Sequence, residues 1–278
     1  MIAIRDTWCA HVEVTNRCPR NCAYCTRYTR HLRSDQLFDL SLEQVEQALI
    51  SLKDKPGLIG IMGGEPIRHP RFAEICGLVQ RWIPKERAHL WTSGGPQWEG
   101  LRNIVRQTFG HLAYNEHNAS QSQVCLHQPL TVAVGEVVAD EQLRKELIDD
   151  CWVQRHWCPS ITHKGAFFCE VAAALDTLLD GPGGYPVDPD WWERKPADFQ
   201  DQVERYCHLC GMCVPQPREL LATKKEKFTP KLLALFREKR LLRVGDDNVE
   251  TVDLKLDREQ VTKLRQGWEP WNYRQDLK

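Results

Sequence analysis

The sequence has no apolar run of about 18 residues, the length that a membrane-spanning helix requires, so no membrane span is expected. It also lacks the apolar core of a signal peptide near its start, where Arg5 and Asp6 lie. Net charge is almost absent, at −1, and says nothing about partners. These absences favour a cytoplasmic protein whose cysteines are reduced.

Cysteine is plentiful, with 12 residues, and three of them share one short segment. Cys18, Cys22 and Cys25 directly follow an apolar segment that reads as a strand. Thiolates are soft ligands that select zinc, copper(I) or iron–sulfur centres. A structural zinc would need a fourth ligand, for which His31 is the nearest candidate. Three thiolates can instead hold an iron–sulfur cluster with one iron left open, and the spacing favours this reading.

A second motif, Gly-Gly-Glu-Pro at residues 63–66, ends an apolar segment at 58–62 that predicts a buried strand. Glycines there would let a ligand approach the backbone, beside a carboxylate at the strand end. The two motifs together resemble those of the radical S-adenosylmethionine (radical SAM) enzymes. The resemblance implies that one electron cleaves S-adenosylmethionine (SAM) to a 5′-deoxyadenosyl radical, which abstracts a hydrogen atom from the substrate.

The resemblance also implies roles for individual residues. Cys18, Cys22 and Cys25 would bind a [4Fe–4S] cluster whose fourth iron chelates SAM. Tyr24 would pack against adenine. The expected contacts of SAM beyond Tyr24 are Gly63, Gly64, Glu65 and Pro66, followed by Ser93 and Asn115, with Glu116 an alternative to Asn115. Ser93 and Asn115 could equally be ordinary polar residues at strand ends.

Strand-like and helix-like segments alternate along the first half, which predicts β/α units with a parallel sheet. Ser41 and Gln44 form a capping-box signal for one helix. The expected fold is α/β, a partial (β/α)6 TIM-like barrel with ligands at the C-terminal strand ends. Strands are predicted at 9–15, 58–62, 88–92, 111–114 and 130–134, and helices directly after the cysteine segment and at 41–52, 70–82, 97–109 and 139–149.

A second set of cysteines follows: Cys151, Cys158, Cys169, Cys207, Cys210 and Cys213. Residues 169–180 read as a helix that ends at Gly181. The region resembles the SPASM or twitch domains of radical SAM enzymes, which carry auxiliary clusters. This implies a second [4Fe–4S] cluster held by Cys158, Cys169, Cys207 and either Cys210 or Cys213. A structural zinc and simple buried thiols remain alternatives. Cys9, Cys76, Cys125 and Cys151 have no partner spacing and are expected to pack as small apolar side chains.

Three domains are expected: a radical SAM barrel at 1–150, an auxiliary iron–sulfur domain at 151–218 and a C-terminal cap at 219–278. In the cap, helices are predicted near 229–240 and 257–266, with short strand-like segments at 241–244 and 251–255.

The substrate is indicated only by charge. Residues 16–34 carry five arginines and no acid, interleaved with tyrosines, and could bind a nucleoside or nucleic-acid base. The arginines could also only balance the charge of a cluster and SAM. Peptide maturation, aminosugar dehydrogenation and a non-catalytic iron–sulfur or zinc protein that binds nucleic acid are the alternatives. A reductant such as flavodoxin or ferredoxin is the expected partner.

Overall fold

The computed structural model describes residues 1–114, 128–156, 159–217, 220, 225–243 and 245–266. Asn115, Glu116, Cys125 and Cys158 lie outside the described residues, so their predicted roles are not addressed by the structure. Within the described residues, no helix has both the length and the hydropathy that crossing a membrane requires.

A six-stranded sheet forms the centre of the molecule, in the order β4-β3-β2-β1-β5-β6. Each neighbouring pair is parallel except β5 with β6, which is an antiparallel hairpin. The fold is thus mixed α/β and consistent with the predicted partial barrel. The strands are β1 (Cys9–Thr15), β2 (Leu58–Gly63), β3 (Ala88–Thr92), β4 (His111–Tyr114), β5 (Ser160–Thr162) and β6 (Gly165–Phe167). The last two come from the segment expected to form the auxiliary domain, and the domain boundaries stay a prediction.

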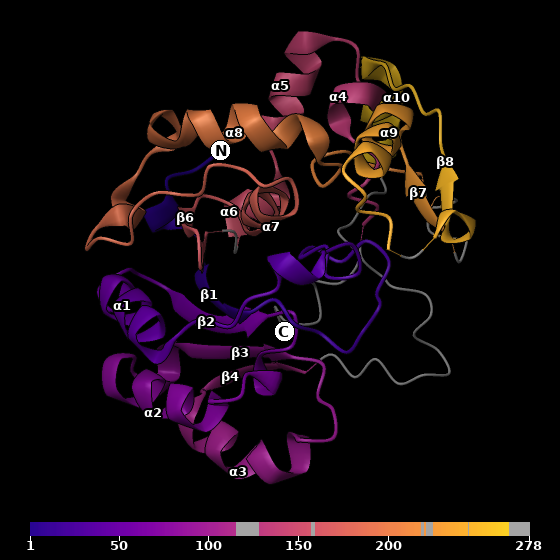
Figure 1. The fold of residues 1–278 in the computed structure, drawn as a ribbon. Helices are drawn as coiled ribbons and strands as arrows, with labels where there is room; N and C mark the ends of the chain where they lie inside the picture. The colour runs from indigo at the N-terminus through magenta and orange to yellow at the C-terminus, as the bar shows by residue number, and fades with distance from the viewer. Residues whose placement is uncertain (115–127, 157–158, 218–219, 221–224, 244, 267–278) are drawn as a thin grey trace.

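Three helices lie on one side of the parallel strands, as Figure 1 shows: α1 (Leu42–Leu52), α2 (Phe72–Trp82) and α3 (Trp98–Thr108). The predicted capping box at the start of α1 is confirmed. The Ser41 hydroxyl accepts a hydrogen bond from the Gln44 amide at 3.2 Å, and the Gln44 side chain accepts one from the Ser41 amide at 2.9 Å. Val45, Leu49 and Leu52 follow at helical spacing and are fully buried, which fixes the face that α1 turns to the sheet.

Helix α2 contains an exposed glycine, Gly77, in its interior. No atom lies within 4 Å of the position that a Cβ would take there. Gly77→Ala is therefore expected to raise the free energy of unfolding by about 0.5–1 kcal/mol, because alanine loses less backbone entropy in a helix. Urea unfolding measures the change, and a loss of stability would contradict the open surroundings of this position.

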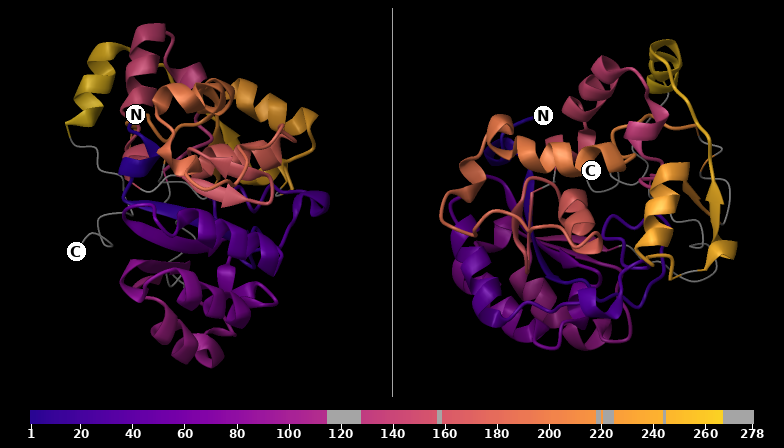
Figure 2. Two further views of the ribbon diagram at one scale, coloured as in Figure 1. Left: turned by 90° about the vertical axis from the view of Figure 1, so that its left-hand side faces the viewer. Right: turned by 45° about the horizontal axis from the view of Figure 1, so that its top comes forward.

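The opposite face of the sheet is covered by the second half of the chain, including α6 (Trp152–His156), α7 (Glu170–Leu178) and α8 (Gln200–Tyr206); Figure 2 shows this layering from two further sides. The prediction that Gly181 terminates the helix is wrong. The left-handed residue is Asp180, with φ 56°, and the amide of Gly181 donates to the carbonyl of Asp176 at 2.7 Å, as in a Schellman motif. Aspartate tolerates this conformation better than most residues, and the Asp180 carboxylate is paired with Arg33 at 2.8 Å.

The remaining elements lie on the side of α9 (Pro230–Glu238), seen at the right of Figure 1. They include α4 (Val134–Val137), α5 (Glu141–Asp149), α10 (Arg258–Arg265) and a parallel pair, β7 (Glu226–Phe228) with β8 (Val249–Thr251). Short 3₁₀ helices lie at Ile4–Asp6, Ser34–Gln36, Pro66–Arg68, Lys85–Arg87, Trp191–Glu193, Pro196–Phe199, Cys207–Leu209 and Asp246–Asn248.

Three predicted elements are absent from the described residues. The segment 130–134 is fully buried but is a turn leading into α4. Its backbone bonds to residues 210–211 and to Thr229 and does not pair with a strand. No helix follows the first cysteines, since Tyr24 and Tyr28 have positive φ values of 55° and 51° that interrupt a right-handed helix. Residues 241–243 form no strand, while β8 begins two residues before the predicted segment.

Candidate functional site

The first three cysteines lie in a loop at the carboxyl end of β1, hereafter the cysteine loop (residues 16–33). All three cysteines are half-buried residues. Burial and the neighbouring Cys25 thiol raise the pKa of Cys18 to about 12. The Arg20 amide donates to Cys18 Sγ at 3.4 Å, and the Thr29 hydroxyl donates to Cys25 Sγ at 3.5 Å. Such donors stabilise thiolate ligands of an iron–sulfur cluster, so this loop fits the group that its sequence implies.

The two glycines at the end of β2 are required by close backbone packing. A Cβ on Gly63 would lie 2.0 Å from the carbonyl oxygen of Thr15, and one on Gly64 would lie 2.6 Å from that of Arg17. The Gly64 amide donates to the Thr15 carbonyl at 2.8 Å. These glycines hold the cysteine loop against β2, and their contact with SAM stays a prediction.

Glu65 is a buried acceptor that joins three strand ends. Its carboxylate accepts hydrogen bonds from the Thr92 hydroxyl at 2.5 Å and from the Ser93 amide at 2.8 Å. Arg20 of the cysteine loop donates to the Ser93 hydroxyl at 3.2 Å. The structure therefore brings two predicted SAM contacts, Glu65 and Ser93, together beside the cysteine loop. Pro66, the next predicted contact, is buried at the start of a 3₁₀ helix.

Tyr24 and His31 of the cysteine loop are attached to β7, which sequence reasoning missed. The Tyr24 amide donates to Glu226 Oε1 at 3.2 Å, and its hydroxyl accepts from the Lys227 amide at 2.7 Å. Packing of Tyr24 on adenine stays a prediction. His31 Nε2 lies 3.0 Å from Glu226 Oε2, and its Nδ1 lies 3.3 Å from the Leu241 carbonyl. Both ring nitrogens are thus engaged, which disfavours His31 as a zinc ligand.

Four charged or titratable side chains are buried between the cysteine loop, β1 and α7. Arg27 Nη2 donates to Glu170 Oε2 at 2.7 Å, and its Nε lies 3.7 Å from Glu13 Oε1. His11 Nδ1 lies 3.1 Å from Glu170 Oε2. Burial opposes the ionisation of Glu170, but Arg27 and His11 outweigh it and lower its pKa to about 2. None of the four residues is more than 3 % exposed.

Glu13 has the opposite shift, because burial raises its pKa from 4.5 to about 7 despite Arg27. Between these two values the folded state keeps the proton that the unfolded state releases, so this group lowers stability as the pH rises. Glu13→Gln removes that loss, and its stability relative to the wild type is expected to increase by about 3 kcal/mol between pH 4.5 and 8. Urea unfolding at both pH values tests this; an equal difference at the two would contradict a protonated Glu13.

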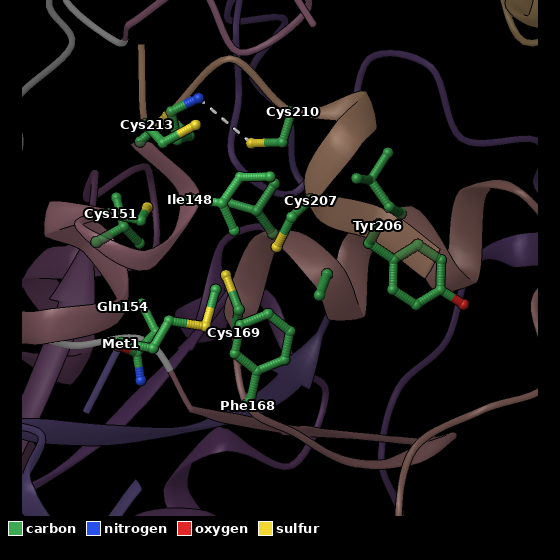
Figure 3. A pocket seen from close by; sticks show the side chains of 15 residues that line it. Met1, Ile148, Cys151, Gln154, Phe168, Cys169, Tyr206, Cys207, Cys210 and Cys213 are labelled. Atoms are coloured by element: carbon green, nitrogen blue, oxygen red, sulfur yellow. Dashed lines mark hydrogen bonds between the residues drawn. The ribbon is translucent and has the colours of Figure 1, made fainter. Parts of the chain in front are cut away.

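Five cysteines line a second site, the cysteine cavity, which Figure 3 shows: Cys151, Cys169, Cys207, Cys210 and Cys213. Cys169 is the N-cap residue of α7. Burial and neighbouring thiols raise the pKa of Cys207, Cys210 and Cys213 well above its usual range. The Met212 amide donates to Cys210 Sγ at 3.4 Å, drawn as a dashed line. Apart from Cys158, every predicted auxiliary ligand is thus brought to one cavity.

The sequence places Cys151 in the second set of cysteines and predicts that it packs as a small apolar side chain. The structure places it in the cavity wall, where burial and nearby Cys169 raise its pKa to about 12. The spacing of Cys151 in the sequence did not indicate this neighbourhood; only the fold places residue 151 beside residues 207–213.

Over the residues that the structure describes, no three or more His, Cys, Asp or Glu side chains form a group that could hold a metal ion.

The five arginines of the cysteine loop are all engaged within the chain. Their partners are Asp39 for Arg17, Ser93 for Arg20, Glu170 for Arg27, Glu226 for Arg30 and Asp180 for Arg33. Their charge therefore gives little support for a nucleic-acid substrate.

Comparison with known proteins agrees with the motifs. Residues 12–111 match the model of the Radical SAM superfamily. The crystal structure of BtrN in complex with AdoMet and 2-DOIA is 16% identical, covers 73% of this chain and 87% of that chain, and superposes with a TM-score of 0.50. The crystal structure of selenomethionine BtrN in an open conformation is 15% identical, with coverages of 73% and 86% and a TM-score of 0.43. The first likeness shows a shared fold. No curated protein sequence matches the chain.

Proposed function

We propose that this chain is a radical SAM enzyme in which Cys18, Cys22 and Cys25 hold a [4Fe–4S] cluster and SAM. The observation that carries the proposal is the joining of the cysteine loop to Glu65 and Ser93 at the carboxyl ends of β1, β2 and β3. These residues lie within the segment that matches the superfamily model. Barrels and open parallel sheets bind ligands at this edge.

When bound, the cluster and SAM supply one electron and a 5′-deoxyadenosyl radical that abstracts a hydrogen atom from the substrate. The chain's own residues bind and orient SAM. Glu65, fixed by Thr92 and Ser93, presents a carboxylate to the SAM amino group, together with the backbone of Gly63 and Gly64. Pro66, Ser93 and Tyr24 are further proposed contacts, as is Asn115 outside the described residues.

We further propose that the cysteine cavity holds an auxiliary [4Fe–4S] cluster of the SPASM or twitch kind. Its ligands come from Cys151, Cys169, Cys207, Cys210 and Cys213, with Cys158 as a candidate outside the described residues. The five thiols line a space, which suits a cluster of several atoms better than one zinc ion. The auxiliary cluster would anchor the substrate or accept an electron from the substrate radical.

The first experiment is anaerobic reconstitution with iron and sulfide, followed by dithionite and SAM, with mass-spectrometric detection of 5′-deoxyadenosine. About eight irons per chain, the content of two cubane clusters, are expected together with this product. Well-formed clusters without the product would instead indicate an electron-transfer or binding protein. Flavodoxin or ferredoxin, the proposed natural reductants, can then replace dithionite.

The auxiliary cluster is tested by the double variant Cys207→Ala/Cys210→Ala. Loss of about four irons is expected, whereas loss of zinc with all iron retained would replace the cluster by a structural zinc.

For the substrate, a nucleoside or nucleic-acid base, a peptide and an aminosugar are all candidates, and the first of them is weakened because the arginines that favoured it are engaged within the chain. Retention on DNA, RNA and peptide matrices at low salt separates them, because phosphate binding is strongly salt-dependent. Equal retention on all three matrices would argue against a nucleic-acid substrate. A cytoplasmic location, where thiols stay reduced, is part of the same proposal.

A further inference from the structure

The cysteine loop is attached to β7, a strand about two hundred residues further along the chain. A central part of the link is the carboxylate of Glu226, which is 1% exposed. It accepts from the Tyr24 amide at 3.2 Å and from Arg30 Nη1 at 3.0 Å, and it lies 3.0 Å from His31 Nε2. A buried carboxylate is costly unless it is paired and hydrogen-bonded, so these three contacts keep the loop and the strand together.

Tyr24 is the residue through which this contact reaches the cysteines. It lies between Cys22 and Cys25, and its φ of 55° is a conformation that residues other than glycine rarely adopt. Both ends of the residue are held by β7: the amide by Glu226 and the hydroxyl by the Lys227 amide, at 2.7 Å. Because the backbone angle at residue 24 sets the direction of the chain between the two cysteines, it also sets where their thiols point.

We propose that Glu226 is a positioning residue for the radical cluster. It holds Tyr24 in the left-handed conformation and so fixes the Cys22 and Cys25 thiols as ligands of one cluster. The C-terminal segment, in which the sequence shows no cofactor motif, is then part of the cluster site. This inference rests on the proposed function, since it concerns the same cluster.

The test compares Glu226→Ala and Glu226→Gln with a matched control, Glu250→Gln. Glu250 lies on β8, opposite Lys227 in the register, and forms an ion pair with it while half exposed. Each protein is reconstituted anaerobically, and three quantities are measured: iron per chain, the electron paramagnetic resonance spectrum of the reduced cluster with and without SAM, and the reduction potential. Thermal unfolding of the metal-free proteins is recorded in parallel.

For Glu226→Ala we expect loss of the signal that responds to SAM and a fall from about eight to about four irons per chain. For Glu226→Gln, which can still accept from the Tyr24 amide but not from all three partners, we expect retained iron with a shifted spectrum and potential. The control should match the wild type. Retention of the auxiliary cluster shows that a variant is folded, because none of the Glu226 contacts described above involves a cysteine of the cavity.

Glu226 variants with the wild-type iron content, spectrum and potential would overturn the inference. If such variants only unfolded at a lower temperature, Glu226 would stabilise the fold without positioning the cluster. Failure of the proposed function looks different: the wild type itself would then show no signal that responds to SAM.

Discussion

Replacing Cys22 by alanine is expected to reduce the formation of 5′-deoxyadenosine to the level of a protein-free control and to remove about four irons per chain. Cys22 is the middle one of three thiols in the cysteine loop. His31, the nearest candidate for a replacement ligand, has both ring nitrogens engaged elsewhere. With only two thiolate ligands, two irons of the cubane would have no protein ligand, so the protein would hold the cluster weakly and lose it to the solution. The auxiliary cluster should remain.

The matched control is Cys76→Ala. Cys76 is a fully buried cysteine of α2, on the face of the sheet away from the cysteine cavity. Its replacement should leave both the iron content and the formation of 5′-deoxyadenosine as in the wild type. If Cys22→Ala still cleaved SAM, the assignment of the radical cluster to this loop would be discarded.

The second large effect is expected in Arg27→Met, which should lower the free energy of unfolding of the metal-free protein by about 3–5 kcal/mol. Arg27 is the counter-charge of Glu170, at 2.7 Å, in a region that excludes water. Methionine has a similar length but no charge, so the variant leaves the buried Glu170 carboxylate without its counter-charge. His11 Nδ1 lies 3.1 Å from Glu170, but burial lowers the pKa of His11, so the neutral ring does not replace that charge.

A surface pair provides the comparison for this measurement. Arg71 and Glu74 are 2.6 Å apart, but both side chains are about half exposed. Arg71→Met should therefore cost less than about 1 kcal/mol in the same urea experiment. A similar small cost for Arg27→Met would show that the buried network is not held by its charges. The double variant Arg27→Met/Glu170→Gln should recover part of the loss, because it removes the unpaired carboxylate as well.

Local signals in the sequence predicted most of the sheet and its first helices. The strands at 9–15, 88–92 and 111–114 were predicted from short apolar segments bounded by turn residues. The structure confirms all three. The start of α1 followed from Ser41 and Gln44, whose reciprocal hydrogen bonds depend only on residues three apart. The cysteine and glycine motifs were similarly local, and they marked a segment that the superfamily model also matches.

What the sequence could not show depends on residues far apart. The segment 130–134 is apolar and buried, but apolarity alone does not separate a strand from a turn packed beneath other segments. Cys151 lies near Cys207 only because of the fold. His11 and Glu13, two polar residues in an otherwise apolar strand, were a visible signal of a buried network. Glu13 pairs with Arg27, but the partner of His11, Glu170, lies more than 150 residues away.

The attachment of the cysteine loop to β7 also bears on how the protein is made. Glu226 and Lys227, which fix Tyr24, are translated nearly two hundred residues after the loop. The native surroundings of these three thiols therefore cannot exist on a nascent chain that lacks residues 226–228. Iron delivered before that point would meet a loop without its final conformation, so cluster insertion at this site belongs after translation of β7.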